Sequence, residues 1–356
     1  PILVNNTIVG AFGGNTGSAV YANGYDNQVQ FFNNLLIGPS GQNAVYCDGT
    51  YQQQSPAFTN NDAFSPNGTG LAGTCSGQSG QNGNISADPQ FVNASTGDFH
   101  LQSTSPAVDA GSNSVPYLPQ ADYAANPRIL DGNNDCVSTV DIGAYELTVG
   151  ANVSFSPNAL TFANQPIRTT SSPQTAVLSN TGNTCFQFSS LGITGDFAEE
   201  NNCPTAGVRG GSSCAFTIAF TPTATGNRLG SLAVTGSDGI KKWGPAVGLS
   251  GTGVDFSLTA NPTGATVKHG QSAKFSLSLT PVGGAFNSAV ALSCSGLPKY
   301  ASCSFLPASP IPGSNGTTSV LTLSTSGNTA RGSFSVLIVG TSGSDSHSAT
   351  ILLTVN

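Results

Sequence analysis

The chain has 356 residues; 8% of them are charged, against about 25% in an ordinary soluble domain, while 44 are Gly and 21 are Pro. Ser, Thr, Asn, Gly and Val replace the usual helix formers, which indicates short strands and many turns and excludes helical bundles, coiled coils and most α/β enzyme folds. No apolar run approaches the ~18 residues of a transmembrane helix. The sequence begins at Pro1 without a Met or a visible signal peptide, and we interpret it as a processed product or a fragment.

Negative charge is concentrated in the first part of the chain. Residues 1–150 carry eleven of the seventeen carboxylates and one basic residue, Arg128, for a net charge of −10. Residues 151–254 carry +1 and residues 255–356 carry +2. Because a segment of −10 repels phosphate backbones and no basic stripe occurs elsewhere, the sequence predicts no nucleic-acid partner.

The N-terminal region contains a repeat. Asn-Asn pairs begin at Asn5, Asn33 and Asn60, in steps of 28 and 27 residues, and the string from Ala19 to Gly24 is echoed from Ala44 to Gly49. Fixed periods of this length are typical of a solenoid, and short β-rich runs ending in Gly or Asn favour a parallel β-helix. Asn residues at equivalent turns are then expected to form a hydrogen-bonded ladder, unless the pairing is accidental in an Asn-rich segment.

After residue 84 the repeat is replaced by a series of short motifs: DPQF from Asp88, SPAVDAG from Ser105, NPR from Asn126 and DIGAYE from Asp141. This series resembles the C-terminal end of bacterial secreted β-helix proteins called choice-of-anchor Q domains. The resemblance covers about residues 1–147 and implies a right-handed β-helix closed at its C-terminal end. It supplies no established catalytic residue.

Within this series, an oxygen-rich loop resembles a calcium-binding loop. Asp131, Asn133 and Asp135 alternate, and Asp141 follows. Cys136 stands where an EF-hand needs Gly, so an EF-hand is disfavoured, and either a different surface Ca²⁺ site or a loop of Asx turns is expected. No other cofactor is expected.

After Thr148 the sequence pattern predicts strands separated by polar turns, which is typical of β-sandwiches. The series from LSNTG at Leu178 to LSGTG at Leu249 is similar to choice-of-anchor D modules, which are immunoglobulin-like and common in bacterial surface proteins. Residues 255–356 look like a second bacterial immunoglobulin-like repeat. The predicted fold is therefore all-β: the end of a β-helix at 1–150, then sandwiches at 151–254 and 255–356.

Eight cysteines, without any Cys-x-x-Cys pair, favour disulfides in an oxidising, extracellular setting over metal sites or reduced thiols. Spacing predicts three bridges, and parity leaves a fourth that would clamp the β-helix to the first sandwich, unless its two thiols are free. The last of the three spacing-based bridges is expected to close a hairpin. The predicted pairs are Cys47–Cys75, Cys203–Cys214, Cys294–Cys303 and, by parity, Cys136–Cys185.

These residues give little indication of enzymatic activity. A lyase of acidic polysaccharides needs basic residues, and residues 1–150 offer only Arg128. A hydrolase of neutral glycans needs two carboxylates ~5–9.5 Å apart; single candidates are present but form no recognisable cluster. His100, His269 and His347 lie in separate modules, and Trp243 is either a sugar platform or a packed aromatic. The single carboxylates are Asp26, Asp48, Asp62, Asp88 and Asp98.

These observations predict a non-enzymatic structural or adhesive protein, extracellular or on a bacterial cell surface; the alternative is a secreted carbohydrate-active or carbohydrate-binding β-helix protein. Expected partners are other copies of the chain or surface glycans. Ile2, Leu3 and Val4 open the sequence inside a predicted coil, so an uncapped, adhesive β-helix end is expected. Head-to-tail contacts through this end would build filaments, unless Pro1 is only a fragment boundary.

Overall fold

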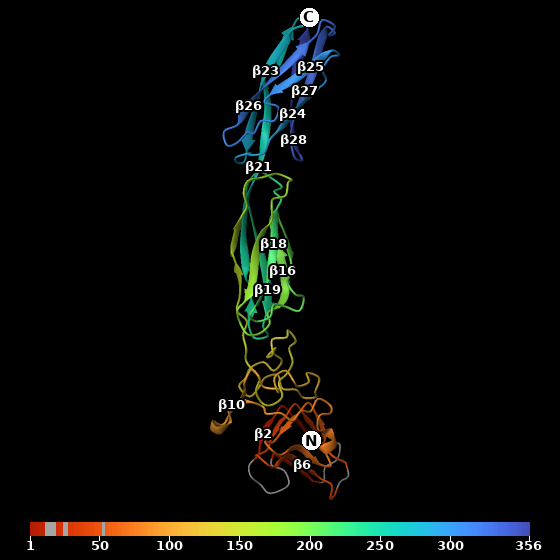
Figure 1. The fold of residues 1–356 in the computed structure, drawn as a ribbon, viewed down its shortest axis with the longest axis vertical. Coiled ribbons are helices and arrows are strands. Elements are labelled where there is room, and N and C mark those ends of the chain that lie inside the picture. The colour runs from red at the N-terminus through yellow and green to blue at the C-terminus, as the bar shows by residue number, and fades with distance from the viewer. Residues whose placement is uncertain (11–18, 24–27, 52–53) are drawn as a thin grey trace.

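Strands form nearly all the regular structure of the chain. The computed structural model describes residues 1–10, 19–23, 28–51 and 54–356, which form an elongated rod with its modules in line (Figure 1). Two short 3₁₀ helices, η1 (Ser76–Gln78) and η2 (Ala94–Thr96), are the only helices among these residues. None of the described residues forms a helix of the length and hydrophobicity that crossing a bilayer requires. The prediction of an all-β chain is confirmed.

The described part of the N-terminal region contains nine short strands stacked in three levels. Equivalent strands pair in parallel, and two of the three sheets advance by the predicted 28 or 27 residues, with Ile2 opposite Gln30 and Leu35 opposite Asp62. We call this unit the strand stack. Its three sheets are β1 (Ile2–Val4), β4 (Gln30–Phe32) and β7 (Ala57–Thr59); β2 (Thr7–Val9), β5 (Leu35–Ile37) and β8 (Asp62–Phe64); and β3 (Val20–Asn23), β6 (Asn43–Asp48) and β9 (Thr69–Gly73).

The predicted asparagine ladder is present in the strand stack. The backbone N–H and side-chain amide of Asn6 both donate to Asn34 Oδ1 at 2.9 Å, and those of Asn34 donate to Asn61 Oδ1 at 2.9 Å. Asn61 in turn donates to Asn84 Oδ1, a fourth step that the repeat did not reveal. Asn34 and Asn61 are fully buried, so the ladder supplies internal partners to amides that water cannot reach.

Apolar side chains fill the strand stack beside this ladder. Phe31 and Phe58, from successive levels, stack with ring centroids 4.6 Å apart. The disulfide Cys47–Cys75 joins β6 to the residues just after β9, hence two neighbouring levels. A hairpin of β10 (Phe91–Asn93) and β11 (Asp98–Leu101) follows.

Residues 102–152, which we call the closing segment, contain no strand or helix although all of them are described. They lie between the strand stack and the first sandwich (Figure 1). Leu101, Ala107 and Ile142 pack with Leu35 of the stack in a small core.

The first sandwich has a core between two sheets. Residues alternate between buried and exposed along β18, as expected for a strand with one face on a core. Phe162, Phe197 and Phe220 meet at the centre. One sheet contains β12 (Val153–Ser156), β15 (Gln174–Asn180), β18 (Ser212–Phe220) and β17 (Phe197–Asn201); the other contains β16 (Gln187–Ile193), β19 (Gly226–Ser237) and β21 (Ala246–Asn261), with β13 (Ala159–Thr161), β14 (Gln165–Pro166) and β20 (Lys242–Trp243) alongside.

The second sandwich has its own core, with Phe256, Phe275 and Phe286 among its buried members. Its sheets are β21, β23 (Ser272–Val282), β26 (Thr317–Thr325) and β25 (Ala301–Leu306), and β22 (Gly264–Val267), β28 (Asp345–Val355), β27 (Gly332–Ser342) and β24 (Ala291–Ser295).

A single strand, β21, belongs to both sandwiches. Residues 246–253 pair with β19, and residues 255–261 pair with β23. The boundary expected at 254/255 therefore falls inside a continuous strand of sixteen residues, about 50 Å long at the rise of an extended chain. No linker separates the two cores.

The expectation that Cys294–Cys303 closes a hairpin is wrong. Cys294 lies on β24, which pairs with β27, whereas Cys303 lies on β25, which pairs with β26 in the opposite sheet. The bond therefore ties the two sheets of the second sandwich together. The physical reason is that the chain crosses from one sheet to the other between these residues.

Candidate functional site: the carboxylates of the closing segment

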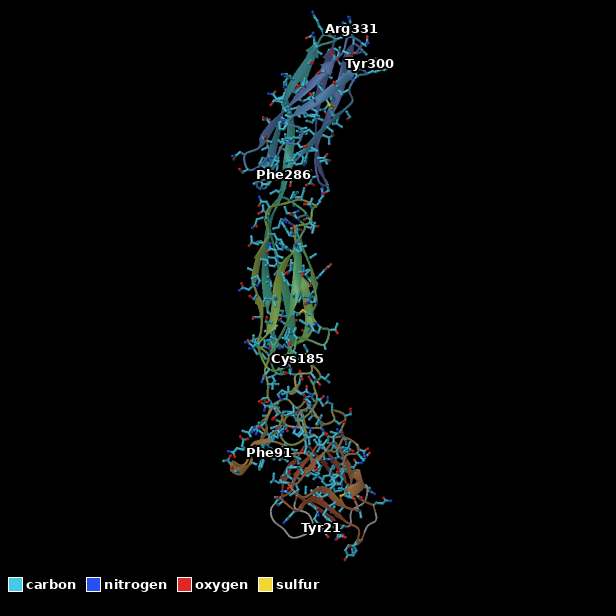
Figure 2. All side chains as sticks on the ribbon, in the orientation of Figure 1. Tyr21, Phe91, Cys185, Phe286, Tyr300 and Arg331 are labelled. Carbon is cyan, nitrogen blue, oxygen red and sulfur yellow. A yellow bond between two sulfur atoms is a disulfide. The ribbon has the colours of Figure 1, made fainter. Side chains whose placement is uncertain are left out.

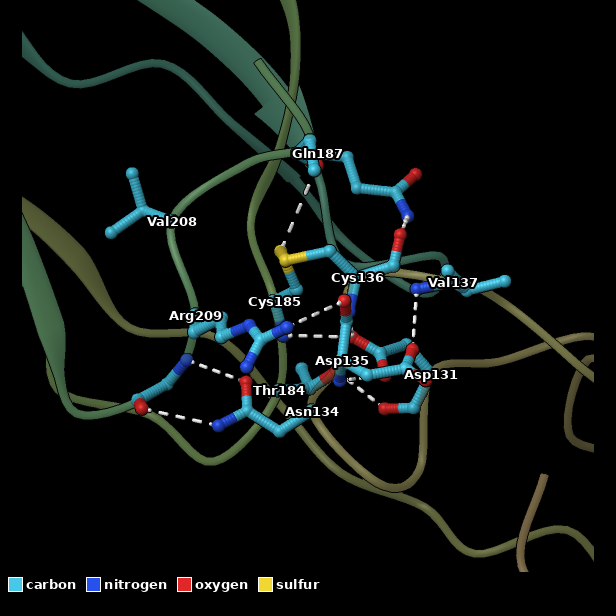
Figure 3. The surroundings of a disulfide bond; sticks show 12 residues. Asp131, Asn134, Asp135, Cys136, Val137, Thr184, Cys185, Gln187, Val208 and Arg209 are labelled. Atoms are coloured by element: carbon cyan, nitrogen blue, oxygen red, sulfur yellow. Dashed lines mark hydrogen bonds between the residues drawn. A yellow bond between two sulfur atoms is a disulfide. The ribbon is translucent and has the colours of Figure 1, made fainter. Parts of the chain in front are cut away.

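The predicted calcium loop lies where the closing segment meets the first sandwich (Figure 3). Asp131 is buried; its Oδ1 accepts the N–H of Asp135 at 3.0 Å, and its Oδ2 accepts those of Cys136 and Cys185 at 3.1 and 3.2 Å. Asn133 and Asp135 each accept the N–H two residues further on, at 2.9 and 2.7 Å, which is the geometry of Asx turns.

Asp141 has a separate set of partners. Its Oδ1 accepts the N–H of Asp109 at 2.7 Å, and its Oδ2 accepts the N–H of Leu147 at 2.6 Å. A calcium ion needs six to eight oxygens directed at one point, whereas the oxygens of Asp131 and Asp141 are directed at N–H groups. The structure brings Asp131, Asn133 and Asp135 into one loop without Asp141, and it favours Asx turns over a Ca²⁺ site.

Asp131 also lies beside two sulfur atoms. Its carboxylate and the Sγ atoms of Cys136 and Cys185 lie within 4.8 Å of one another. The two sulfurs are bonded to each other at 2.00 Å, so neither is a thiolate able to bind a metal. The cluster is therefore structural.

Asp109 is a central residue of this network that the sequence analysis missed. Its carboxylate accepts the N–H groups of Gly132 and Asn133 at 3.3 and 2.7 Å. Burial raises the pKa of Asp109 to about 7, and the negative charges of Asp141 and Asp131 contribute in the same direction. Its position inside the SPAVDAG motif was the only signal in the sequence.

A buried ion pair lies behind Asp141. The Arg128 guanidinium donates to the carbonyl oxygens of Gly143 and Ala144, both at 3.1 Å, and lies 3.6 Å from Glu146 Oε1. The Glu146 carboxylate accepts the N–H of Asp141. Burial raises the pKa of Glu146. It also raises the pKa of Asp141, to about 6. Because Arg128 is 4% exposed and bonded to the backbone, it is not placed to hold an acidic substrate.

The same residues dock the closing segment onto the strand stack. The Asn5 amide donates to the carbonyl oxygen of Asp141 at 2.9 Å, and the N–H of Gly143 donates to the carbonyl oxygen of Asn33 at 2.8 Å. Gly143 has a φ of +113°, and a Cβ there would press on the Leu35 side chain. Glycine is thus required where the DIGAYE motif turns over the stack.

The closing segment is also fastened to the first sandwich. Beside the disulfide Cys136–Cys185, the Thr184 hydroxyl donates to the carbonyl oxygen of Asp131 at 2.7 Å, and the Gln187 amide donates to that of Cys136 at 3.1 Å. We call this set, with the contacts below, the junction clamp (Figure 3).

Further contacts of the junction clamp involve the loop before β18. Asn134 accepts the N–H of Gly210 at 2.7 Å and donates to its carbonyl oxygen at 3.1 Å. Arg209 donates to the carbonyl oxygen of Asp135 at 3.3 Å. Backbone, side-chain and covalent contacts therefore all cross this junction.

All eight cysteines are paired as the spacing and parity predict, and no described cysteine is free: the pairs are Cys47–Cys75, Cys136–Cys185, Cys203–Cys214 and Cys294–Cys303. Cys203–Cys214 lies within one sheet of the first sandwich, beside the β17–β18 pairing.

The other candidate residues are scattered along the rod. His100 lies on β11, His269 in the turn after β22, and His347 on β28, where its Nε2 is 2.8 Å from Asp255 Oδ1. Trp243 packs against the core of the first sandwich, under the Lys241 ammonium at 3.8 Å.

Each candidate carboxylate that the structure describes accepts the N–H of a nearby residue. Asp62 is fully buried and accepts the N–H of Ala87, and burial raises its pKa to about 7. Asp48 accepts bonds from Tyr21 and Thr50 at the surface. Asp88 caps its own turn by accepting the N–H of Gln90. Asp26 lies outside the described residues.

Two surface pockets are lined mainly by apolar side chains. One, of about 280 Å³, opens on the first sandwich between Phe188, Leu191 and Phe216. The other, of about 340 Å³, lies at the N-terminal end of the strand stack, with Leu3, Val20 and Phe31 among its lining. Neither contains a set of convergent ionisable groups.

Comparisons with known proteins leave the function open. No protein-family model matches the chain, and no curated protein matches it. Domains 4 and 5 of the S-layer protein SbsC are similar over 45% of this chain and 76% of that chain, with 19% identity and a TM-score of 0.23. The C-terminal domain of the Streptococcus agalactiae AgI/II polypeptide BspA matches over 57% of this chain and 100% of that chain, with 9% identity and a TM-score of 0.29.

A third similar structure is the Yersinia pseudotuberculosis adhesin InvE, with 11% identity and a TM-score of 0.21. The match covers 57% of this chain and 58% of that chain. Likeness at this level does not assign a function to this chain.

Proposed function

We propose that this chain is a non-enzymatic structural protein of the bacterial cell surface or the extracellular space, and that it acts as a rigid spacer. The observation that carries the proposal is that covalent and hydrogen bonds, rather than a linker, cross both junctions of the rod. The junction clamp holds the closing segment to the first sandwich, and β21 continues from the first sandwich into the second. Inter-domain motion is the usual expectation when a linker separates domains; here a disulfide and a strand replace the linkers.

The proposed architecture is the end of a right-handed parallel β-helix of the choice-of-anchor Q kind, followed by a choice-of-anchor D-like and a second immunoglobulin-like sandwich. The parallel levels of the strand stack and their asparagine ladder support the first part. Four disulfides support an oxidising compartment, since such bonds rarely persist in reducing cytosol.

The absence of enzymatic activity is part of the proposal. The carboxylates of the closing segment that we described serve as acceptors for backbone N–H groups, as Asp131 and Asp141 do. A general acid or base must instead reach the proton it transfers on a substrate.

We also propose that copies associate head to tail. In this arrangement the N-terminal end of the strand stack of one copy docks on a sandwich of the next copy. Ile2 and Val9 are 40% and 47% exposed at this end, next to the apolar pocket lined by Leu3 and Phe31. The net charge of −10 on residues 1–150 complements the +3 of the two sandwiches. Contacts of this type do not close on themselves and build linear chains.

Light scattering over a range of protein concentrations, with electron microscopy of the same samples, tests the association. We expect the mass to rise with concentration and linear chains to form, and Ile2→Glu to keep the chain monomeric because a charge then enters the contact. Val92→Glu, at a site 54% exposed on β10, is the matched control and should behave as wild type. A wild-type chain that stays monomeric at all concentrations contradicts head-to-tail association.

A further inference from the structure

A group of solvent-facing aromatic and polar side chains lies where the β10–β11 hairpin meets the surface of the closing segment. It begins with Asp98 and His100, which share one face of β11. His100 Nδ1 lies 2.6 Å from Asp98 Oδ1, and the same oxygen accepts the His100 N–H at 3.1 Å. These contacts fix the orientation of the imidazole although the side chains of His100 and Asp98 are 48% and 39% exposed.

Two tyrosine rings continue the group. The His100 ring lies 4.1 Å from the Tyr145 ring, centroid to centroid, and Tyr123 meets Tyr145 edge-on at 5.6 Å with an interplanar angle of 77°. The N–H of Tyr123 donates to the carbonyl oxygen of Ala144, so a backbone hydrogen bond holds the two tyrosines near each other. The two rings therefore form a corner whose geometry exists before any ligand binds.

Solvent reaches both the polar side chains of Asp98 and His100 and the aromatic ring of Tyr123. Tyr123 is 81% exposed, which leaves most of its ring uncovered. In the described part of the chain, no group bonds to His100 Nε2 or to Asp98 Oδ2. The hydrogen bond from His100 lowers the pKa of Asp98, so its carboxylate is ionised and free to accept at neutral pH.

We propose that Asp98, His100, Tyr123 and Tyr145 form a binding site for a neutral carbohydrate. A sugar ring presents an apolar C–H face and a rim of hydroxyl groups. The face matches the exposed Tyr123 ring, and the hydroxyls match an acceptor at Asp98 Oδ2 and a second polar atom at His100 Nε2. Since the four side chains are already held in place, binding orders few of them.

Charge selects among the possible glycans. The net charge of −10 on residues 1–150 repels uronate-containing and sulfated polysaccharides. Because Asp98 is already bonded to His100, a cation should bind there more weakly than at an unpaired carboxylate. The site goes beyond the spacer role, because a rigid rod that binds no sugar would still serve as a spacer.

Affinity electrophoresis of the intact chain tests the site. The gels contain one of four neutral polysaccharides (β-glucan, mannan, xyloglucan or dextran) or, for comparison, the acidic polymer polygalacturonate. We expect at least one neutral polymer to retard the protein and polygalacturonate not to do so. Tyr123→Ala should weaken the retardation at least about fivefold, the size of one lost aromatic contact, and Asp98→Asn should weaken it further when combined with Tyr123→Ala.

Tyr117→Ala is the matched control, because Tyr117 is 82% exposed and has no ring partner among the described residues. It should leave retardation unchanged, and thermal unfolding should show that Tyr123→Ala folds as wild type does. The proposal is overturned if no neutral polymer retards the protein, if Tyr123→Ala and Tyr117→Ala behave alike, or if only polygalacturonate binds.

Discussion

The closing segment and the first sandwich adjoin each other, and they satisfy their backbone groups by different means. In the sandwich, β15 and β18 pair over seven residues, so that most backbone groups of these strands bond to one another. In the closing segment there are no strands, and the side chains of Asp109, Asp131 and Asp141 accept the N–H groups that a neighbouring strand would otherwise bond.

The difference shows how an irregular segment can remain ordered at the centre of a rod. A buried N–H without an acceptor is costly, so each of these carboxylates replaces part of a missing sheet. The consequence is that single side chains matter more here than in the sandwich, where the ladder is shared among many residues.

Removing the junction disulfide Cys136–Cys185 should lower the free energy of unfolding more than any of the single substitutions below. Cys136 and Cys185 are 49 positions apart, and the chain-entropy estimate is about 4 kcal/mol for Cys136→Ser with Cys185→Ser, measured as the free energy of unfolding in urea. The matched control is the pair Cys203→Ser with Cys214→Ser in the first sandwich, 11 positions apart, for which about 3 kcal/mol is expected. A junction variant as stable as wild type would show that this disulfide does not stabilise the fold.

Asp131→Ala should destabilise the protein by about 3 kcal/mol, because it leaves the N–H groups of Cys136 and Cys185 without their acceptor. Asp135→Ala, in the same loop but exposed, should cost less than about 1 kcal/mol. Urea denaturation of both variants measures the difference. Equal losses would mean that the loop is held by something other than the Asp131 carboxylate.

Asn61→Ala extends the comparison to the strand stack and should cost about 2 kcal/mol. The substitution leaves the buried N–H of Asn34 without an acceptor and breaks the ladder in its middle. Asn152→Ala, which loses only an exposed bond to Thr181, should be nearly neutral. Thermal unfolding followed by circular dichroism compares them, and similar midpoints for the two variants would argue against a stabilising ladder.

Stability should depend on pH in opposite ways in the two regions. The pKa of Asp109 is raised to about 7, so the folded closing segment binds a proton more tightly than the unfolded chain does. The free energy of unfolding of this segment should therefore fall by about 1–2 kcal/mol as the pH rises from 4 to 7. The bond from Arg228 lowers the pKa of Asp196 in the sandwich, whose contribution should be lost only below about pH 4.

Hydrogen exchange of the two regions between pH 4 and pH 7.5, corrected for intrinsic rates, measures this dependence. Asp109→Asn should flatten the profile of the closing segment and leave that of the sandwich unchanged. A closing segment that becomes more protected as the pH rises would contradict the assigned direction.

Local patterns predicted much of the fold. The Asn-Asn pairs recur because Asn5, Asn33 and Asn60 occupy the same turn with φ near +53°, a conformation that Asn tolerates. Disulfide pairing followed from spacing and parity. Partners far apart in the sequence were not predictable: nothing near Asp109 indicates that it would cap residues 132 and 133.

The continuity of β21 was hidden for a different reason. The string LSGTG, ending at Gly253, has the glycines of a turn, but a Cβ at Gly253 would collide with the carbonyl oxygen of Ala224. The glycine therefore permits a close approach of two backbones within a strand rather than a bend. Sequence alone does not distinguish these uses of glycine.

Small-angle X-ray scattering of the intact chain distinguishes fixed junctions from flexible ones. We expect one extended conformation, that of Figure 1, to fit the wild-type curve. Six Gly and Ser residues inserted between Val254 and Asp255, which interrupt β21, should instead require an ensemble of bent shapes. A wild-type curve that itself requires such an ensemble would show that the junctions are flexible.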